Sequence, residues 1–197
     1  TLWALSDTGV VRWDRGTAAF TAETGQGAPG RDARVLTVGD DGVVYVGTPS
    51  GLALKTRDGW RRSQIGFLAD GVRALAPRRG GGVWVAGPYG LGWFAAGRLH
   101  VVAPKVRVRA MQRGPGGGLW AATQGRGVVA VRPGGIEIHG PAQGMCGESV
   151  RALAASADGR VAAVCADGTF GLWNGSRWQR WAARKIGAVR AVTPVPG

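Results

Sequence analysis

The stretch that decides the fold is residues 72–91, which read VRALAPRRGGGVWVAGPYGL. A strand-like segment is followed by a glycine-rich turn, a second strand-like segment around Trp84, and a short G-P-Y-G turn. The same phrase begins four more times, at Ala33, Val108, Val150 and Val189. Successive starts lie 39, 36, 42 and 39 residues apart. A nearly fixed period of this size predicts a repeat architecture with one structural unit per copy.

The fifth copy is divided between the two ends of the sequence. It runs out at Val195-Pro196-Gly197, and its missing half stands at residues 1–10 as TLWALSDTGV. Joining the ends would place Ala33 41 residues after Val189, close to the other intervals. We therefore expect the array to close on itself by pairing its C-terminal strand beside its N-terminal strands, at Val189 to Pro194, Leu2 to Leu5 and Val10 to Trp13.

Each unit shows short apolar or alternating segments separated by glycine-containing turns, which is typical of β-strands. The second unit predicts four strands, at Val35–Val38, Val43–Val46, Leu52–Lys55 and Trp60–Ser63. Four antiparallel strands per radial repeat describe a blade of a β-propeller. We expect an all-β, five-bladed propeller that forms a single domain over residues 1–197, with blades starting near 33, 72, 108, 150 and 189 and the last completed by 1–32. A β-solenoid is the alternative, but its coils are usually shorter and its ends need caps.

The repeat resembles that of a known family. Its pattern is V-R-x-L, six or seven loop residues, G-x-[VL]-W-[VA] and G-x-x-G-[LV], best seen in Val72–Leu91 and Val108–Val128. This is similar to the two-component-regulator propeller repeat of bacterial sensor ectodomains. Ala33 replaces the first Val of the pattern, and Tyr45 and Ala162 replace its Trp. The resemblance implies that the repeat Trp and Leu pack between blades. Ectodomains of that family usually carry more blades, followed by a membrane segment and a kinase, so it does not by itself imply sensing.

The charge balance is strongly basic, with 25 Lys and Arg against 12 Asp and Glu and a formal net charge of +13. This favours anionic partners such as nucleic acid, acidic glycans, lipid head groups or acidic protein surfaces. Because the arginines are scattered, a merely soluble positive surface is the other interpretation. Basic and aromatic residues interleave over 173–184, but alternation places Trp178 in the core, so nucleic acid is possible but not favoured. No apolar run is long enough for a membrane helix, so no membrane span is expected.

One arginine recurs at the second position of each unit's first strand, at Arg34, Arg73, Arg109, Arg151 and Arg190. This strand is innermost in a propeller, so a ring of guanidinium groups would surround the axis and bind phosphate or carboxylate. Alternatively, each arginine packs its stem between blades and reaches a neighbouring carbonyl. Turns and loops at the same edge add further candidate contacts, at Tyr89, Gln124, Arg126, Met145 and Phe67.

Of the two cysteines, Cys146 stands just before the inner strand of the copy that begins at Val150, and Cys165 stands at the end of the next strand of that copy. Antiparallel neighbours bring these positions together, so a disulfide is one expectation and two free thiols the other. A disulfide would favour an extracytoplasmic location, which we expect here. Because there is no C-x-x-C motif or Cys/His cluster, neither a metal nor a cofactor is expected.

Catalytic patterns are weak. The only two histidines, His100 and His139, are predicted on outer strands, and Gly147–Arg151 misses the last position of G-x-S-x-G. A few acids are not explained by turn geometry and are the candidates for catalysis, but their positions do not recur from one copy of the repeat to the next. They are Asp7, Glu23, Asp32, Asp70 and Glu148. We expect no enzyme activity, but a non-catalytic module that binds an anionic ligand or an acidic protein surface at an arginine-lined axial face. The alternatives are a propeller hydrolase or lyase, with an axial site that uses acids such as Glu148 or Asp32, and a protein-interaction scaffold.

Overall fold

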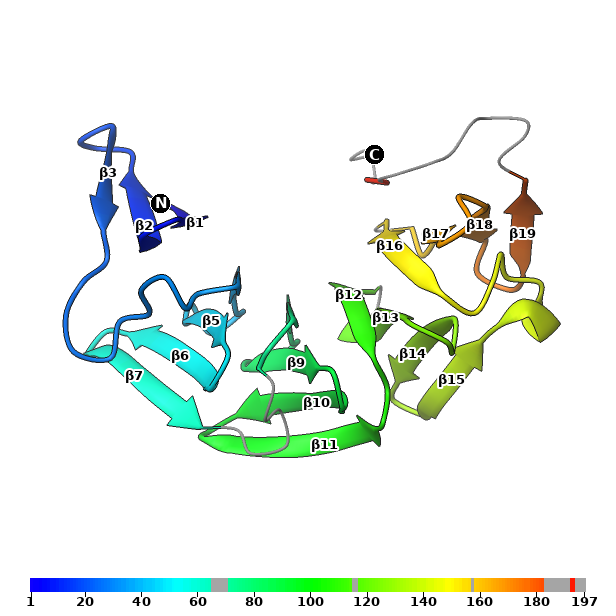
Figure 1. Cartoon of the computed structure of the whole chain (residues 1–197), viewed down its shortest axis with the longest axis horizontal. Coiled ribbons are helices and arrows are strands. Elements are labelled where there is room, and N and C mark those ends of the chain that lie inside the picture. Colours follow the sequence, from blue (N-terminus) through cyan, green and yellow to red (C-terminus); the bar gives the residue numbers. More distant parts are fainter. Residues whose placement is uncertain (65–70, 115–116, 157, 183–191, 194–197) are drawn as a thin grey trace. The chain divides into compact units, whose positions relative to one another are not determined.

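The structure is a computed structural model that describes residues 1–64, 71–114, 117–156, 158–182 and 192–193 (Figure 1). These residues form β-strands joined by turns and loops, with one short 3-10 segment at Pro141–Gln143. The chain divides into two compact units, Thr1–Pro104 and Lys105–Gly197. Each unit is described separately below, as unit 1 and unit 2.

Unit 1 contains three antiparallel sheets. Sheet 1 has three described strands in the order β1 (Leu2–Ser6), β2 (Gly9–Asp14) and β3 (Ala19–Ala22). Sheet 2 consists of β4 (Val35–Val38), β5 (Val44–Thr48), β6 (Gly51–Thr56) and β7 (Gly59–Gln64). Sheet 3 consists of β8 (Ala74–Pro77), β9 (Val83–Gly87), β10 (Gly90–Ala95) and β11 (Arg98–Pro104). Each sheet therefore runs from strand to strand in chain order.

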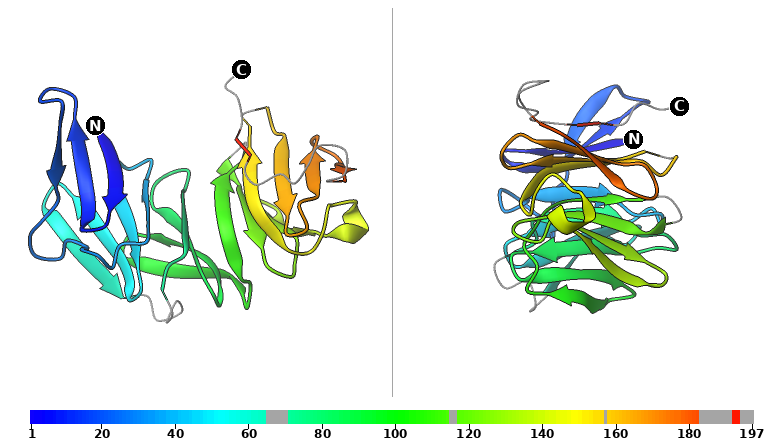
Figure 2. Two further views of the ribbon diagram at one scale, coloured as in Figure 1. Left: turned by 45° about the horizontal axis from the view of Figure 1, so that its top comes forward. Right: turned by 90° about the vertical axis from the view of Figure 1, so that its right-hand side faces the viewer.

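Unit 2 contains two sheets of the same kind. Sheet 4 consists of β12 (Val108–Arg113), β13 (Leu119–Thr123), β14 (Val128–Arg132) and β15 (Gly135–His139). Sheet 5 consists of β16 (Val150–Ala155), β17 (Val161–Cys165), β18 (Phe170–Trp173) and β19 (Trp178–Trp181). The first strands β12 and β16 of these sheets lie in contact (Figure 2). The predicted all-β class is confirmed, and sheets 2 to 5 show the predicted four strands per repeat.

The expected closure of the ends is not shown. Of the predicted strand Val189 to Pro194, only Val192 and Thr193 are described, and neither lies in a strand. The other residues of that segment, Arg190 among them, lie outside the described residues. Sheet 1 accordingly shows three strands where the four others show four.

A β-bulge explains the spacing of the V-R-x-L phrase. Val72 and Leu75 belong to one core cluster, and Val150 and Leu153 belong to another, although residues three apart in a regular strand face opposite sides. The pairing of β16 with β17 shifts between Val150 and Ala152, which leaves Arg151 as an extra residue. An inserted residue resets the alternation, so that Val and Leu both reach the core while the arginine points outward.

The repeat tryptophans fill the space between neighbouring sheets, as the resemblance implies. Trp120 on β13 is 5% exposed, and its ring lies 6.0 Å from that of Trp173 and 6.3 Å from that of Trp178, both on sheet 5. His139 on β15 completes the group, with its ring 5.3 Å from Trp120. This aromatic cluster forms the core that joins sheets 4 and 5.

Candidate functional site

Arg34, Arg73, Arg109 and Arg151 lie at the start of the first strands of sheets 2 to 5, and we call this border of each sheet the arginine edge. Arg109 is the extra residue between the pairs Val108–Thr123 and Ala110–Ala122, as Arg151 is in sheet 5. Arg34 and Arg73 directly precede β4 and β8. Their N–H groups donate to Gly47 O at 2.9 Å and to Ala86 O at 2.8 Å, the residues that pair with the next positions, Val35 and Ala74. All four of these arginines are exposed.

The side-chain partners of these arginines differ between the units. In unit 2, Arg109 Nη2 donates to Gln124 Oε1 at 3.2 Å, and Arg151 Nη2 donates to the Ala166 carbonyl. Arg151 thus reaches a neighbouring carbonyl, as the second interpretation expects. Within the described part of the chain, neither Arg34 nor Arg73 has a side-chain partner, and none of the four forms an ion pair with a carboxylate.

A rigid turn places Gln124 and Arg126 at the arginine edge of sheet 4. The buried Thr123 hydroxyl donates to Gly127 O at 2.8 Å and accepts from Arg126 N–H at 3.2 Å. The N–H groups of Gly125 and Gly127 both donate to the carbonyl of Glu148, in the loop before β16. Gln124 and Arg126 are consequently exposed on a turn whose backbone is fixed from both sides.

A disulfide between Cys146 and Cys165 holds the loop that enters sheet 5, with their Cα atoms 6.0 Å apart. It ties the loop 140–149 to the end of β17. This loop leads directly into β16, whose second residue is Arg151. The same loop buries Met145, which is 1% exposed, so the expectation that Met145 contacts a ligand is wrong. It packs into the core between sheets 4 and 5 instead. Phe67 lies outside the described residues.

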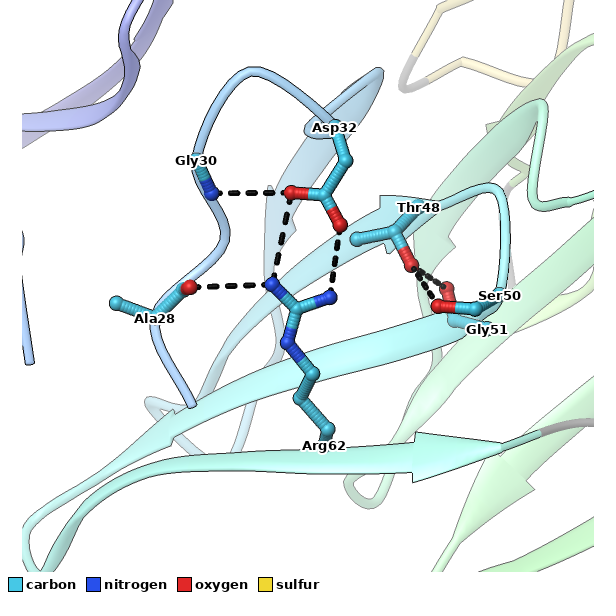
Figure 3. A network of polar contacts seen from close by, with 7 residues as sticks. All are labelled: Ala28, Gly30, Asp32, Thr48, Ser50, Gly51 and Arg62. Carbon is cyan, nitrogen blue, oxygen red and sulfur yellow. Dashed lines mark hydrogen bonds and ion pairs between the residues drawn. The ribbon is translucent and has the colours of Figure 1, made fainter. Parts of the chain in front are cut away.

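In unit 1 an ion pair holds the corresponding loop. Arg62 on β7 contacts Asp32 through Nη1 and Oδ2 at 2.7 Å, and its Nη2 donates to Ala28 O at 3.1 Å (Figure 3). Gly30 N–H donates to the other oxygen of Asp32 at 3.0 Å. The hydrogen bond from Arg62 lowers the pKa of Asp32, which is therefore a carboxylate at neutral pH. The loop thus reaches Arg34 and β4 from a position that this ion pair fixes.

The turn between β9 and β10 carries Tyr89, which is 50% exposed. Because β9 ends and β10 begins at the border where β8 starts, Tyr89 lies at the arginine edge of sheet 3 together with Arg73. Each unit therefore presents exposed arginines with further candidate contacts at the same borders of its sheets.

Comparison with solved structures identifies the fold. The chain is similar to virginiamycin B lyase from Staphylococcus aureus, with a TM-score of 0.69 and 14% identity over 88% of this chain and 62% of that one. It is also similar to the extracellular domain of a protein described as a hybrid two component system, BT3049 from B. thetaiotaomicron, with a TM-score of 0.65, 17% identity, and coverage of 91% and 32%. The RRP9 WD40 repeats match with a TM-score of 0.62, 14% identity, and coverage of 90% and 59%.

The fold is that of a β-propeller. The described sheets are its blades, and at these identities the likeness shows the fold alone. The chain spans about 60% of the length of the lyases that it matches. No family model and no curated protein matches its sequence. Among the described residues, no helix has the length and apolar character to cross a membrane.

The acids named above as potential catalytic groups are distributed over different environments. Glu23 is engaged in ion pairs with Arg12 and Lys55, and Asp32 is paired with Arg62. Asp7 is exposed in the turn between β1 and β2, and Asp70 lies outside the described residues. In the described ranges, no three His, Cys, Asp or Glu side chains gather closely enough to hold a metal ion.

The two histidines lie on the outer strands of their blades, as predicted. His100 on β11 is exposed and stacks on Trp93, with ring centres 3.7 Å apart. His139 is buried in the aromatic cluster, and burial lowers its pKa, so that its imidazole is neutral at pH 7.

Sequence reasoning missed two threonines that shape the arginine edge. Thr48 and Thr123 end the second strands of their blades, and each buried hydroxyl donates to a backbone carbonyl of the following turn, Gly51 O or Gly127 O (Figure 3 shows Thr48). The sequence signal for them was that a threonine recurs at the end of two of the second strands. In blade 5 the equivalent residue is Cys165 of the disulfide.

Proposed function

We propose that this propeller is a non-catalytic binding module that recognises an anionic ligand at its arginine edges. The observation that carries the proposal is that Arg34, Arg73, Arg109 and Arg151 are exposed at equivalent positions of four sheets, without a carboxylate partner among the described residues. The bulge keeps Val and Leu of the phrase in the core and leaves the arginine at the surface, where its guanidinium group is open to a ligand.

The chemistry of these side chains favours phosphate or carboxylate ligands. A guanidinium group offers planar, multiple donors that match both groups, and it stays charged at all physiological pH values. Gln124 beside Arg109 adds an amide that can orient a polar ligand, and Arg126 adds a further positive charge. The net charge of +13 supports association with an acidic partner, whether a small anion or an acidic protein surface.

We also propose that residues 189–194 pair with β1 and complete blade 1 as its fourth strand. The sequence phrase requires this strand, and β1 is an edge of the three-stranded sheet 1. The β1 amides that do not bond to β2 are then expected to exchange slowly with deuterium. Deletion of residues 189–197 should make these amides exchange quickly and leave β2 protected. Equally fast exchange in the full chain would contradict the closure.

An extracytoplasmic location is part of the same proposal. Disulfides persist in oxidising compartments, and the fold neighbours include extracellular domains.

The anion site is tested by removing the arginines in a matched comparison. Arg73, Arg109 and Arg151 are replaced together by Gln, and Arg15, Arg98 and Arg177 together form the control. The control arginines are exposed at turns on the opposite border of their sheets, so both variants lose three charges. Pyrophosphate and a short oligogalacturonate serve as probes in titration calorimetry at two salt concentrations.

The first variant should bind at least one probe about tenfold or more weakly, which corresponds to ~1.4 kcal/mol, and should lose most of the salt dependence. The control should bind as the unmodified protein does. Equal weakening in both variants would mean a nonspecific effect of net charge, and unchanged binding in the first would overturn the proposal. Turnover of a probe would overturn its non-catalytic part.

A further inference from the structure

Unit 1 contains a hollow between blades 1 and 2, at a distance from the arginine edge. Its volume is about 730 Å³, within the range of small-molecule sites. The turns 41–43 and 56–58 line it, and these lie at the border of sheet 2 opposite Arg34. Trp3, Val43 and Val44 form an apolar wall, and the remaining lining residues are Arg12, Glu23, Asp41, Gly42, Lys55, Thr56, Arg57 and Asp58.

Glu23 organises the cations of this hollow. Its side chain is only 10% exposed, and both oxygens are engaged. Oε1 lies 3.2 Å from Arg12 Nε, while Oε2 lies 3.1 Å from Lys55 Nζ and accepts a hydrogen bond from Trp60 Nε1 at 3.2 Å. One largely buried carboxylate thus lies against two positive charges and neutralises one of them. The lining also contains Arg57 and the acids Asp41 and Asp58, so its formal charges balance and an anion is held by local contact, not by a net positive charge.

Asp41, the second acid on the wall, is also fully engaged. Its Oδ2 accepts from Tyr45 Oη and Gly82 N–H, both at 2.8 Å, and its Oδ1 accepts from Val43 N–H at 3.1 Å. Burial would raise the pKa of Asp41, but these hydrogen bonds together lower it below the ordinary value. Asp41 therefore holds blades 2 and 3 together and does not compete for the cations of the hollow.

The two terminal nitrogens of the Arg12 guanidinium group, which we call its fork, remain available for a ligand. Its contact with Glu23 is made by Nε, and its two terminal nitrogens have no partner among the described residues. The side chain is 42% exposed and lines the hollow. Two parallel N–H groups of a guanidinium match the two oxygens of a carboxylate, a geometry that lysine cannot reproduce. The ion pair with Glu23 keeps this guanidinium group beside the wall of the hollow.

We propose that the hollow binds a small organic acid, with its carboxylate on the Arg12 fork and its apolar body against Trp3 and the neighbouring valines. The apolar wall selects against inorganic anions, because they would leave it uncovered. This site is independent of the arginine edge, since none of Arg34, Arg73, Arg109 and Arg151 lines the hollow.

The test compares two ligands and three variants. Benzoate carries the carboxylate and a flat apolar body, and benzyl alcohol is its neutral counterpart. Arg12→Lys retains a charge that can pair with Glu23 but removes the fork, whereas Arg12→Gln removes both. Arg15→Gln is the matched control, because Arg15 is exposed in the turn after β2 and does not line the hollow. Affinities are measured by calorimetry, and thermal unfolding shows whether each variant is folded.

Benzoate should bind the unmodified protein and Arg15→Gln equally, and should bind Arg12→Lys about tenfold more weakly although that variant unfolds at a similar temperature. Benzyl alcohol should bind the unmodified protein more weakly than benzoate does. Its affinity should be the same for the unmodified protein and for Arg12→Lys. The proposal is overturned if Arg12→Lys binds benzoate as the unmodified protein does, or if benzoate and benzyl alcohol bind equally. It is likewise overturned if benzoate shows no binding to the unmodified protein at about 10 mM, where even a site of millimolar affinity would be occupied.

Discussion

Replacing Trp120 by Ala is expected to lower the free energy of unfolding of unit 2 by about 3–5 kcal/mol, as for other buried aromatic side chains. Trp120 is 5% exposed and packs against Trp173, Trp178 and His139, so its removal leaves a cavity between two blades. The Arg132 guanidinium, whose centre lies 5.3 Å from the Trp120 ring, loses its aromatic partner as well. Urea denaturation followed by circular dichroism measures the effect.

The control for this prediction is Ile136→Ala in the same unit. Ile136 is 45% exposed on the outer strand β15, and exposed substitutions usually change stability by less than about 0.5 kcal/mol. If Trp120→Ala shifts the denaturation midpoint no more than Ile136→Ala does, the aromatic cluster does not hold blades 4 and 5 together. A separate transition for unit 1 should stay unchanged in both variants.

Replacing both Cys146 and Cys165 by Ser is expected to destabilise the protein by about 3 kcal/mol. The bond closes a loop with a sequence separation of 19, and cross-links of this length restrict the unfolded chain by an amount of that order. For a protein of this size, the melting temperature should fall by roughly 6–12 °C, since 1 kcal/mol corresponds to about 2–4 °C. Calorimetry with and without reducing agent measures this effect, and titration of free thiols shows whether the bond is present.

Replacing both cysteines by Ser should also make the backbone at the arginine edge of unit 2 less well held. The disulfide holds the loop whose Glu148 carbonyl accepts from Gly125 and Gly127, so these two amides should exchange faster with deuterium in the double serine variant. The amide of Val72, bonded to Thr48 O in unit 1, provides the control. If reducing agent leaves both the melting temperature and the exchange of Gly125 and Gly127 unchanged, the bond does not support this edge.

Much of the blade structure follows from local sequence. Glycine-containing turns were predicted between the strands, and glycine accepts the positive φ that such turns require, as the observed values of 74° at Gly42 and 117° at Gly59 show. Alternation correctly placed Trp178 in the core. The proximity of Cys146 and Cys165 also followed from the expected pairing of adjacent antiparallel strands.

The contacts that shape the sites did not follow from local sequence. The V-R-x-L phrase was interpreted as a regular strand, although an odd spacing between two buried residues already requires an extra residue. Glu23 and Trp60 are 37 positions apart, and Asp32 and Arg62 are 30 apart. No periodicity relates such pairs, because they depend on how one blade packs against the next. The hollow beside Arg12 was missed for the same reason.

The bulges at the start of β12 and β16 also make the arginines that they hold replaceable. Since the extra residue takes no place in the strand pairing and points away from the core, its side chain can change while the neighbouring Val and Leu keep the blade folded. A combinatorial library that varies positions 109 and 151 would therefore alter surface chemistry on an unchanged scaffold. Evolution has the same freedom, so substitutions at very few positions can change the surface chemistry of this edge without disturbing the strand pairing.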